Sequence, residues 1–483
     1  MAPDIAALSF LLSVSTTADL SHHVKVFLMH EQGTGGAPKY GTPAQLPLVG
    51  TISNPLSSIT VPRSSKPDEG SVGYYKATTG QDVVVELAAS ERAGMFKYTF
   101  PAGSTRNNIL VDVSHVLPSF RGQGLGQGYA GGEFQIMSDG HYEASGVYNN
   151  GWNRSPDWTI YSSTKDAWNS QIFSKVTTTS TNASNLELLY TSLYHMNLLP
   201  TNKTGENPGW ESTEPYYDDI FTFWDTFRYS TALLQIIQPT MYEEFIRSTI
   251  DIWRHDGYLP DGRSSNYNGR TQGGSNADNV LADAYVKSVR GKVNWEDGYA
   301  AMVKDAEVPP PNTNPPDPMA PEASTKEGRG ALPDWLKYGF ITTKFSRSAS
   351  RAVEYAYNDF SLYQVAKGLN KTADAAKYLT RSRNWRNHWN PKQTAIGFSG
   401  FVVPRNETDF LPVNPLTDAG YWGDATYQVT SWGNSFGDIH DMAKLVELMG
   451  GRDTFLARLD ATFTPGANPA NPNGVLFDAT NEP

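Results

Sequence analysis

The chain has 483 residues, a formal net charge of −11 and no cysteine. That length suits two or three domains rather than one compact core. The lack of cysteine excludes disulfides, thiolate metal sites and a cysteine nucleophile, so any metal must be bound by oxygen or histidine. The negative charge argues against a nucleic-acid partner, and no apolar run is long enough to span a membrane. Aromatic residues make up 12% of the chain, which favours a globular protein with aromatic-lined clefts.

The N-terminal region contains an apolar run, residues 5–12, without a basic residue ahead of it. A secretory signal peptide needs that basic start, so we interpret the run as a strand or an altered start, with a secretion signal as the alternative. Asn-X-Ser/Thr glycosylation sequons add slight support for secretion, and they stand at Asn153, Asn182, Asn202, Asn370 and Asn406. We therefore predict a secreted or extracellular protein.

Residues 1–180 show the pattern of an antiparallel β-sandwich. Short β-branched runs at 24–29, 82–87, 95–100 and 108–113 are separated by clusters of Gly, Pro and Ser. The pattern continues at 141–143 and 158–161. Such spacing is typical of a sandwich.

The character of the chain changes after residue 180. Residues 185–199 carry an apolar face at helical spacing and end at Pro200, so we assign 181–205 to a helical linker. Helical patterns then recur without strands between them, at 241–253, 276–290, 295–304, 350–369, 373–389, 438–449 and 453–463. Residues 206–483 are therefore predicted to form an all-α domain, in which the Pro-rich stretch 308–321 is a surface loop.

An octet, residues 221–228, is the most informative local stretch. It reads Phe-Thr-Phe-Trp-Asp-Thr-Phe-Arg and begins a predicted helix that Pro239 ends. Trp224 offers a flat apolar ring, and Asp225 and Arg228 offer charged groups for paired hydroxyls, which suits a sugar. The alternative is a helix N-terminus capped by Asp225, with Trp224 and Phe227 in the core.

Four other stretches carry candidate chemistry. A glycine-rich loop at 29–38 follows a strand, but it has neither the lysine nor the helix of a phosphate loop, and a plain turn is its alternative. The polar loop 264–279 suits a polyol ligand, although Asn276 or Asp278 can simply cap the next helix. Residues 422–441 are rich in Trp, Gly and carboxylates, with Asp438 as a possible helix cap. Asn481 and Glu482 offer oxygen ligands for a hard cation.

Taken together, these stretches resemble glycoside hydrolase family 92, the calcium-dependent exo-α-mannosidases, and most closely its fungal members. The matching motifs occur in the family's order, at 30–36, 91–94, 98–101, 224–228, 282–287, 350–360, 440–441, 448–451 and 481–483. The resemblance implies an N-terminal β-sandwich joined by a short helical segment to an (α/α)6 toroid.

The resemblance also implies a reaction and a set of site residues. Family members hydrolyse α-mannosidic bonds with inversion, using one carboxylic acid and one carboxylate base, and a bound calcium ion. It implies that Asn481 and Glu482 are calcium ligands and that Trp224 and Asp225 contact the terminal mannose, with Arg228 behind them.

This sequence departs from the family pattern at three places. The family's acid is the Glu of a Trp-Glu-Tyr-Ser-Phe segment, whereas residues 432–436 read Trp-Gly-Asn-Ser-Phe, so the acid position falls on Gly433. Asp424 and Asp438 are the possible substitutes. The family's base lies beyond the Asn-Glu-Pro motif, and its N-terminal strands are longer, so we expect the chain to be incomplete at both ends and its toroid to lack the closing helices.

These observations lead to a mannosidase hypothesis and an alternative. The first is an exo-acting, inverting hydrolase of terminal α-linked mannose, most simply α-1,2-linked, in mannans or N-glycans. The alternative is a non-catalytic mannoside-binding paralogue that lacks the general acid and base. A third reading, cleavage of mannosyl phosphodiesters, needs no acid and ranks last. We expect mannose-containing glycans as partners, no nucleic acid or membrane, and a monomer.

Overall fold

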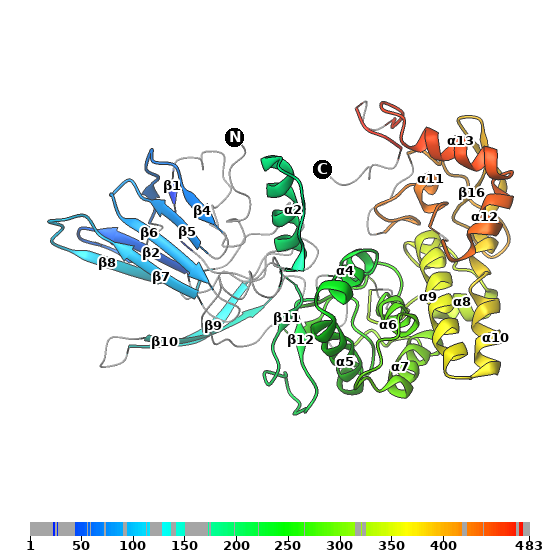
Figure 1. Ribbon diagram of the computed structural model, residues 1–483, viewed down its shortest axis with the longest axis horizontal. Coiled ribbons are helices and arrows are strands. Elements are labelled where there is room, and N and C mark those ends of the chain that lie inside the picture. The colour runs from blue at the N-terminus through cyan, green and yellow to red at the C-terminus, as the bar shows by residue number, and fades with distance from the viewer. Residues whose placement is uncertain are drawn as a thin grey trace.

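The structure is a computed structural model of the chain. It describes residues 23–24, 27, 44–55, 57, 59–71, 74–89, 94–112, 114–115, 128–136, 142–149, 172, 175–197, 199–220, 222–264, 266–313, 320, 325–417, 423–437, 439–469 and 473–476. A β domain and a helical domain lie at opposite ends of the molecule, with helix α2 between them (Figure 1). This is the predicted order of a β domain followed by a helical domain.

The β domain is built from antiparallel strands. Strands β4 (Glu69–Ser71), β5 (Tyr74–Thr78), β6 (Val84–Ala89) and β7 (Gly94–Thr99) form a sheet in chain order. Strand β2 (Ala44–Val49) pairs with β8 (Asn107–Asp112), β1 (His23–Val24) with β3 (Val61–Pro62), and β9 (Gly128–Ile136) with β10 (Tyr142–Asn149). The strands expected at 82–87, 95–100 and 108–113 are thus present to within two residues, whereas 158–161 lie outside the described residues.

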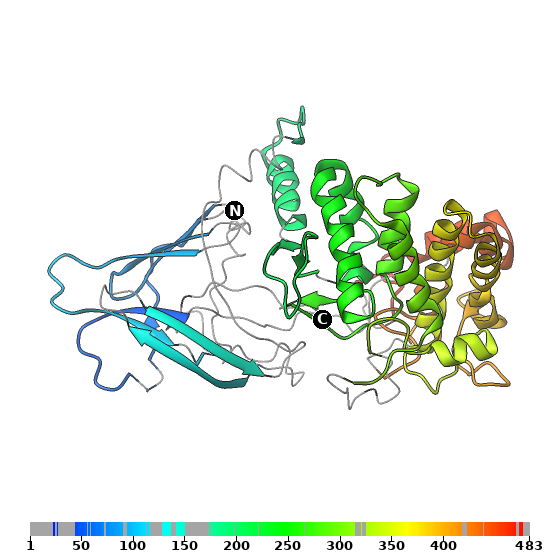
Figure 2. The same ribbon diagram turned by 90° about the horizontal axis from the view of Figure 1, so that it is seen from below.

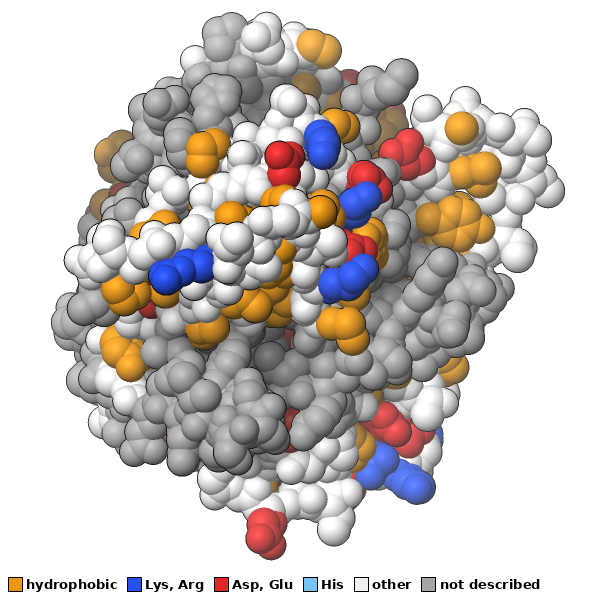
Figure 3. Space-filling model, turned by 90° about the vertical axis from the view of Figure 1, so that its left-hand side faces the viewer, with side chains coloured by type: hydrophobic (Ala, Val, Ile, Leu, Met, Phe, Trp, Pro, Cys, Tyr) orange, Lys and Arg blue, Asp and Glu red, His pale blue; other side chains and the backbone are white. Residues whose placement is uncertain are grey.

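The β core follows from the two-residue alternation of side chains along each strand. Tyr75 and Leu87 are buried and face one another across β5 and β6. On the opposite face, Glu86 forms an ion pair with Lys97 of the neighbouring strand. Buried side chains of β2 join the same apolar cluster, so the sheets pack face to face as in a sandwich. Figure 3 shows this end of the molecule, where acidic and basic side chains alternate over a largely uncharged surface.

Helix α2 (Ala183–Met196) forms the linker between the two domains. Its N-terminus is capped by the side chain of Asn182, which accepts a hydrogen bond from the backbone N–H of Asn185 at 3.1 Å. After it, strand β11 (Thr201–Asn202) pairs with β12 (Tyr217–Asp218) and leads into the helical domain. The domain limits at 180 and 205 stay predictions.

The helical domain begins with α3 (Phe223–Thr226), α4 (Ser230–Ile237), α5 (Pro239–Asp256), α6 (Ala277–Val286) and α7 (Trp295–Glu307). It continues with α8 (Leu332–Tyr338), α9 (Ser348–Gly368) and α10 (Thr372–Arg381), and then α11 (Ser431–Asn434), α12 (Met442–Leu448) and α13 (Arg452–Thr462). Helix α5 packs against α4, α6 and α7, and α12 packs against α13; the helices lie side by side in both views (Figure 1 and Figure 2). Long helix α9 packs against both α6 and α10, so it is central to the domain.

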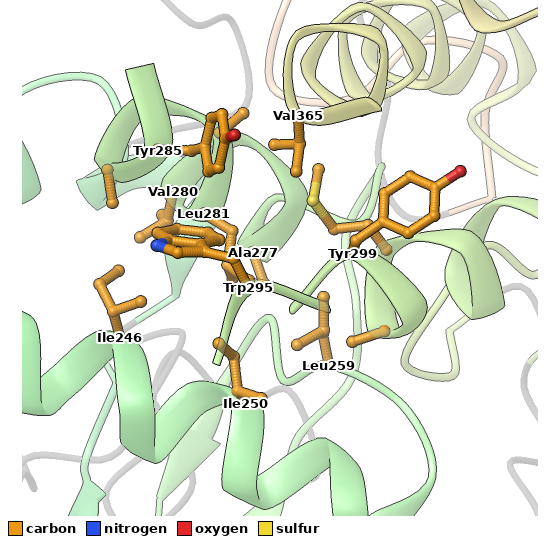
Figure 4. Close-up of a cluster of buried hydrophobic side chains, with 14 of the residues drawn as sticks. Ile246, Ile250, Leu259, Ala277, Val280, Leu281, Tyr285, Trp295, Tyr299 and Val365 are labelled. Carbon is orange, nitrogen blue, oxygen red and sulfur yellow. The ribbon is translucent and has the colours of Figure 1, made fainter. Parts of the chain in front are cut away.

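Apolar side chains from four helices meet in one core (Figure 4). Ile250 of α5, Leu281 of α6, Trp295 of α7 and Val365 of α9 are all buried there. No helix among the described residues is both long and apolar enough to cross a membrane. The apolar periodicity of these helices therefore marks the faces that they turn to this core.

The structure corrects three local expectations. The helix predicted from the octet to Pro239 is broken into α3 and α4, because Tyr229 (φ −148°, ψ −45°) leaves the helical region, and Pro239 begins α5 rather than simply ending a helix. The helix predicted at 373–389 ends at Arg381, and a 3₁₀ turn, Asn384–His388, follows. Two hairpins, β13 (Arg263–Ser264) with β14 (Tyr267–Asn268) and β15 (Trp389–Ala395) with β16 (Phe398–Val402), interrupt a region predicted to be purely helical.

Candidate functional site

The octet contains α3, and the loop that carries Asp261 is bonded to the start of this helix. The backbone N–H of Phe223 donates to the carbonyl of Asp261 at 2.7 Å, which fixes α3 against the loop ahead of β13. The Trp224 indole is only 7% exposed, and its edge lies beside Gly262. The Asp225 side chain is exposed and accepts a hydrogen bond from the Thr222 hydroxyl at 2.6 Å. Burial of Trp224 agrees with the packing alternative, whereas Asp225 presents an accessible carboxylate.

Arg228 is exposed one turn beyond Asp225. Its guanidinium lies 4.5 Å from the centre of the Phe227 ring, so the side chain folds over its neighbour. Phe227 in turn packs on Tyr357 of α9, with ring centres 5.8 Å apart. Arg228 therefore lies on the same side of the domain as the middle of α9.

A second carboxyl group, that of Asp261, lies in the loop that bonds to the start of α3. It is 2% exposed, and its Oδ1 accepts from the backbone N–H of Asn276 at 3.2 Å. Its Oδ2 has no hydrogen-bond partner in the part of the chain that the structure describes. Burial, together with the nearby charges of Glu354 and then Asp225, raises the pKa of Asp261 well above its usual range. Glu354 comes from α9 and Asp225 from α3, so charges from two other parts of the chain raise the pKa of Asp261.

The polar loop at 264–279 is pressed against α9. The backbone N–H of Gly274 and the side-chain amide of Asn276 both donate to Oε2 of Glu354, the latter at 3.3 Å. The backbone N–H of Ser275 donates to Oδ1 of Asn358 at 2.9 Å. Asn276 does occupy the cap position of α6, but its side chain makes no capping hydrogen bond. The loop is thus joined to α9 by hydrogen bonds from Gly274, Ser275 and Asn276.

The N-terminus of α9 meets a segment that carries Asp424. The carbonyl of Asp424 accepts from the backbone N–H of Arg347, and that of Ala425 from Ala349 at 2.9 Å. Nearby, the Tyr427 hydroxyl accepts from the side-chain amide of Gln272 at 3.2 Å. Asp424 is exposed, so it lies at the surface near the first turn of the helix that carries Glu354.

A buried ion network lies under the loop. Asp278, an alternative cap in the sequence, instead pairs with Arg329 at 2.8 Å, and both are fully buried. Arg329 also pairs with Asp359 at 2.6 Å, and Asp359 accepts two further bonds from Arg381. The capping interpretation of Asp278 is therefore wrong, because its carboxylate has a cationic partner elsewhere in the fold. This network joins α6, α9 and α10.

The position expected to hold the catalytic acid lies in α11. Gly433 is buried, and a Cβ added there would lie 2.5 Å from Cγ2 of Val429. The adjacent Trp432 lies in an apolar cluster and donates to the Thr462 hydroxyl at 2.9 Å. A glutamate at 433 would therefore require Val429 to move.

Other candidate residues lie outside the described residues, namely Asp438, Asn481, Glu482 and the loop at 30–36. Among the residues that the structure describes, no group of three or more His, Asp or Glu side chains is arranged to hold a metal ion. Asp225 lies at the head of α3, whose first residue bonds to the backbone of Asp261, and Asn276 bonds to both Asp261 and Glu354.

A cavity of about 220 Å³ lies elsewhere, between the linker and the helical domain. Its lining includes Met196 at the end of α2 and Leu199 beyond it, together with Tyr229 and Leu234 around α4. It is mainly apolar and includes none of the three carboxylates. We place the chemistry at the carboxyl cluster, because polar groups that converge define a sugar site better than an apolar void does.

Asp261 and Glu354 were not among the candidate residues from the sequence. Asp261 follows a proline within an ordinary turn signal, and Glu354 lies within a regular helical period. A hint was available in the Gly273–Gly274 pair, because adjacent glycines mark a close approach of backbone to another group.

Comparisons with known proteins agree on one family. The sequence profile of the glycosyl hydrolase family 92 catalytic domain matches residues 154–483, and that of the family's N-terminal domain matches residues 21–198. An "uncharacterized secreted glycosidase" of Arthroderma benhamiae is 36% identical over a 295-residue alignment, with 56% of this chain and 33% of that protein covered. The match thus spans about a third of that relative's length.

Solved structures share the fold. A family GH92 inverting mannosidase of Bacteroides thetaiotaomicron superposes with a TM-score of 0.72 at 20% identity, covering 93% of this chain and 68% of the other. A GH92 α-mannosidase of the same organism, in complex with mannoimidazole, gives a TM-score of 0.70 at 20% identity, covering 95% and 69%.

Proposed function

Because the chain belongs to glycoside hydrolase family 92, we propose that it binds terminal α-linked mannose and that the protein is an exo-acting, inverting α-mannosidase. The proposed substrates are mannans or N-glycans, with α-1,2 linkage as the simplest case. Support comes from solved GH92 structures described as mannosidases, one of them in complex with mannoimidazole.

The observation that carries the proposal is the convergence of carboxyl groups beside the octet. Asp225 is exposed at the head of α3. Its charge and that of Glu354 both raise the pKa of Asp261. Carboxylates that accept hydroxyl hydrogens are the usual means of holding a sugar ring. In this proposal Asp225 and Arg228 bind mannose hydroxyls, and Trp224 forms part of the wall of the site.

The proposal includes a calcium ion that Asn481 and Glu482 would bind. Their amide and carboxylate oxygens are the donors that calcium takes, but an ion needs about six to eight such oxygens. Further protein oxygens, waters or sugar hydroxyls would complete the set. When bound, the ion would polarise the sugar hydroxyls that it contacts.

Proton donation is the weakest part of a mannosidase site in this chain. Gly433 has no side chain that can donate, and general acid catalysis contributes roughly 10²- to 10⁴-fold to rate. Asp424 and Asp438 are the proposed substitutes. A mannoside-binding protein without this acid is therefore the second candidate function, and the glycine at 433 is the observation that favours it.

The test separates binding from hydrolysis. The purified chain with calcium is incubated with α-1,2-mannobiose, and released mannose is measured beside calorimetry with mannoimidazole. Mannose release with binding supports the enzyme, and binding without release supports the second candidate. No heat with mannoimidazole and no mannose release would refute both. Gel filtration with light scattering tests the proposed monomer.

Secretion is proposed on the name of one relative. The Arthroderma benhamiae protein is described as a secreted glycosidase, and a mannan or N-glycan substrate is itself found outside the cytosol. Detection of the native protein in culture medium, rather than in washed cells, tests the proposal.

A further inference from the structure

Glu354 has the geometry of a ligand-binding carboxylate. Its Oε2 is anchored by the backbone N–H of Gly274 and the side chain of Asn276. Its Oε1 makes no hydrogen bond within the described residues, and the side chain is partly exposed. One oxygen is therefore fixed to the protein, and the other keeps its capacity to accept a hydrogen bond.

The neighbouring loop is shaped around this carboxylate. A Cβ added at Gly273 would clash with Oε2 of Glu354, and one added at Gly274 would lie 2.5 Å from Oδ1 of Asn358 and 2.9 Å from Cβ of Glu354. These contacts are shorter than any side chain tolerates. Only a two-glycine loop fits this close, so the carboxylate is held in one place before any ligand arrives.

Asp261 supplies an independent sign of a ligand. It is 98% buried, and its Oδ2 has no hydrogen-bond partner among the described residues. No Lys or Arg among the described residues pairs with it, and the charges that face it are those of Glu354 and Asp225. Asn276 bonds to both carboxyl groups, through its backbone N–H to Asp261 and through its amide to Glu354. Burial and the charges of Glu354 and Asp225 raise the pKa of Asp261 well above its usual range, which favours its protonated form.

We propose that Glu354 is a sugar-binding residue of this site, whose Oε1 accepts a hydroxyl of a neutral hexose, and that Asp261 is a positioning residue behind it. The inference rests on the proposed function and deepens it, because it names a second carboxylate for the sugar. It also sets the substrate class. Asp225 and Glu354 together present negative charge to the ligand, so an uncharged sugar is accepted and a phosphorylated one is repelled.

Calorimetry on single variants tests the role of Glu354. Methyl α-mannoside, mannoimidazole and mannose 6-phosphate are titrated into the wild-type chain, Glu354→Gln and the control Glu447→Gln. Glu447 is an exposed glutamate of α12 that pairs with Lys444. We expect Glu354→Gln to weaken binding of the neutral ligands by roughly 10- to 100-fold, with mannose 6-phosphate gaining relative to them. Binding by Glu354→Gln within about threefold of wild type would overturn the inference.

Asp261→Asn tests the positioning role, because an amide replaces a neutral acid without changing its shape. We expect Asp261→Asn to keep affinity within about threefold, and Asp261→Leu to lose it as Glu354→Gln does. Circular dichroism and the urea midpoint establish that each variant is folded. A loss of tenfold or more in Asp261→Asn would show an ionised Asp261 and contradict the role.

The two proposals fail in different ways. If the wild type binds no mannoside, the proposed function fails, and glucose and galactose are then titrated in the same way. Binding of either hexose that depends on Glu354 supports the inference alone. If no neutral hexose binds to the folded chain, the inference is refuted as well.

Discussion

Asp359 joins two buried arginines, and its replacement by Asn should destabilise the helical domain strongly. Oδ1 of Asp359 accepts from Arg329 at 2.6 Å and from Arg381 at 2.7 Å. Oδ2 accepts from Arg381 at 2.7 Å and from Trp335 at 2.9 Å. An Asn side chain keeps the shape but has one accepting oxygen, so two of these four bonds are lost in either orientation of the amide.

The cost follows from the burial of the partners. Arg329 and Asp359 are fully buried, and Arg381 is 9% exposed. Breaking such a network from one side costs about 3–5 kcal/mol. Urea unfolding should show this loss for Asp359→Asn. Glu296→Gln, which breaks the exposed Glu296–Lys371 pair, should lose under about 1 kcal/mol. A loss below about 1 kcal/mol for Asp359→Asn would refute the reasoning.

Three further predictions concern the loop, the pH dependence and the metal. Gly273→Ala should displace Glu354 and cost about 1–3 kcal/mol with weaker mannoside binding, whereas Gly423→Ala, which has open space around it, should be neutral in both assays. Burial raises the pKa of Asp278 from 3.8 to about 7, so its contribution to stability is fully present below pH 3.8 and is lost as the pH rises to about 7. The urea midpoint should therefore fall less between pH 5 and pH 8 in Asp278→Asn than in the wild type, and an equal fall in the two proteins would contradict this. Removal of calcium with EDTA should weaken mannoimidazole binding at least tenfold in calorimetry, and unchanged binding excludes the proposed metal.

Local patterns predicted the helices better than they predicted the site. The apolar period of 350–369 gave α9 to within two residues, because its faces follow the core that it joins. The break between α3 and α4 is not predicted, because no glycine or proline marks Tyr229, where the backbone leaves the helical region. Asp278 was taken as a possible cap because its partner, Arg329, lies 51 residues away in the chain.

The residues of the candidate site also differ in how far the sequence predicts them. Asp225 carried a local signal, an aromatic neighbour and a guanidinium three residues on. Asp261 and Glu354 carried none, because their roles arise only when the Gly273–Gly274 loop brings them to Asn276. A site that is formed by tertiary contacts cannot be recognised from any single stretch of the sequence.

The crystal structure of the chain soaked with mannoimidazole and calcium tests the central claim most directly. The account predicts one inhibitor molecule whose hydroxyls contact Asp225 and Oε1 of Glu354, with a calcium ion held by Asn481 and Glu482 beside it. An inhibitor bound elsewhere, for instance in the apolar cavity beside α2, with the three carboxyl groups left untouched, would contradict it.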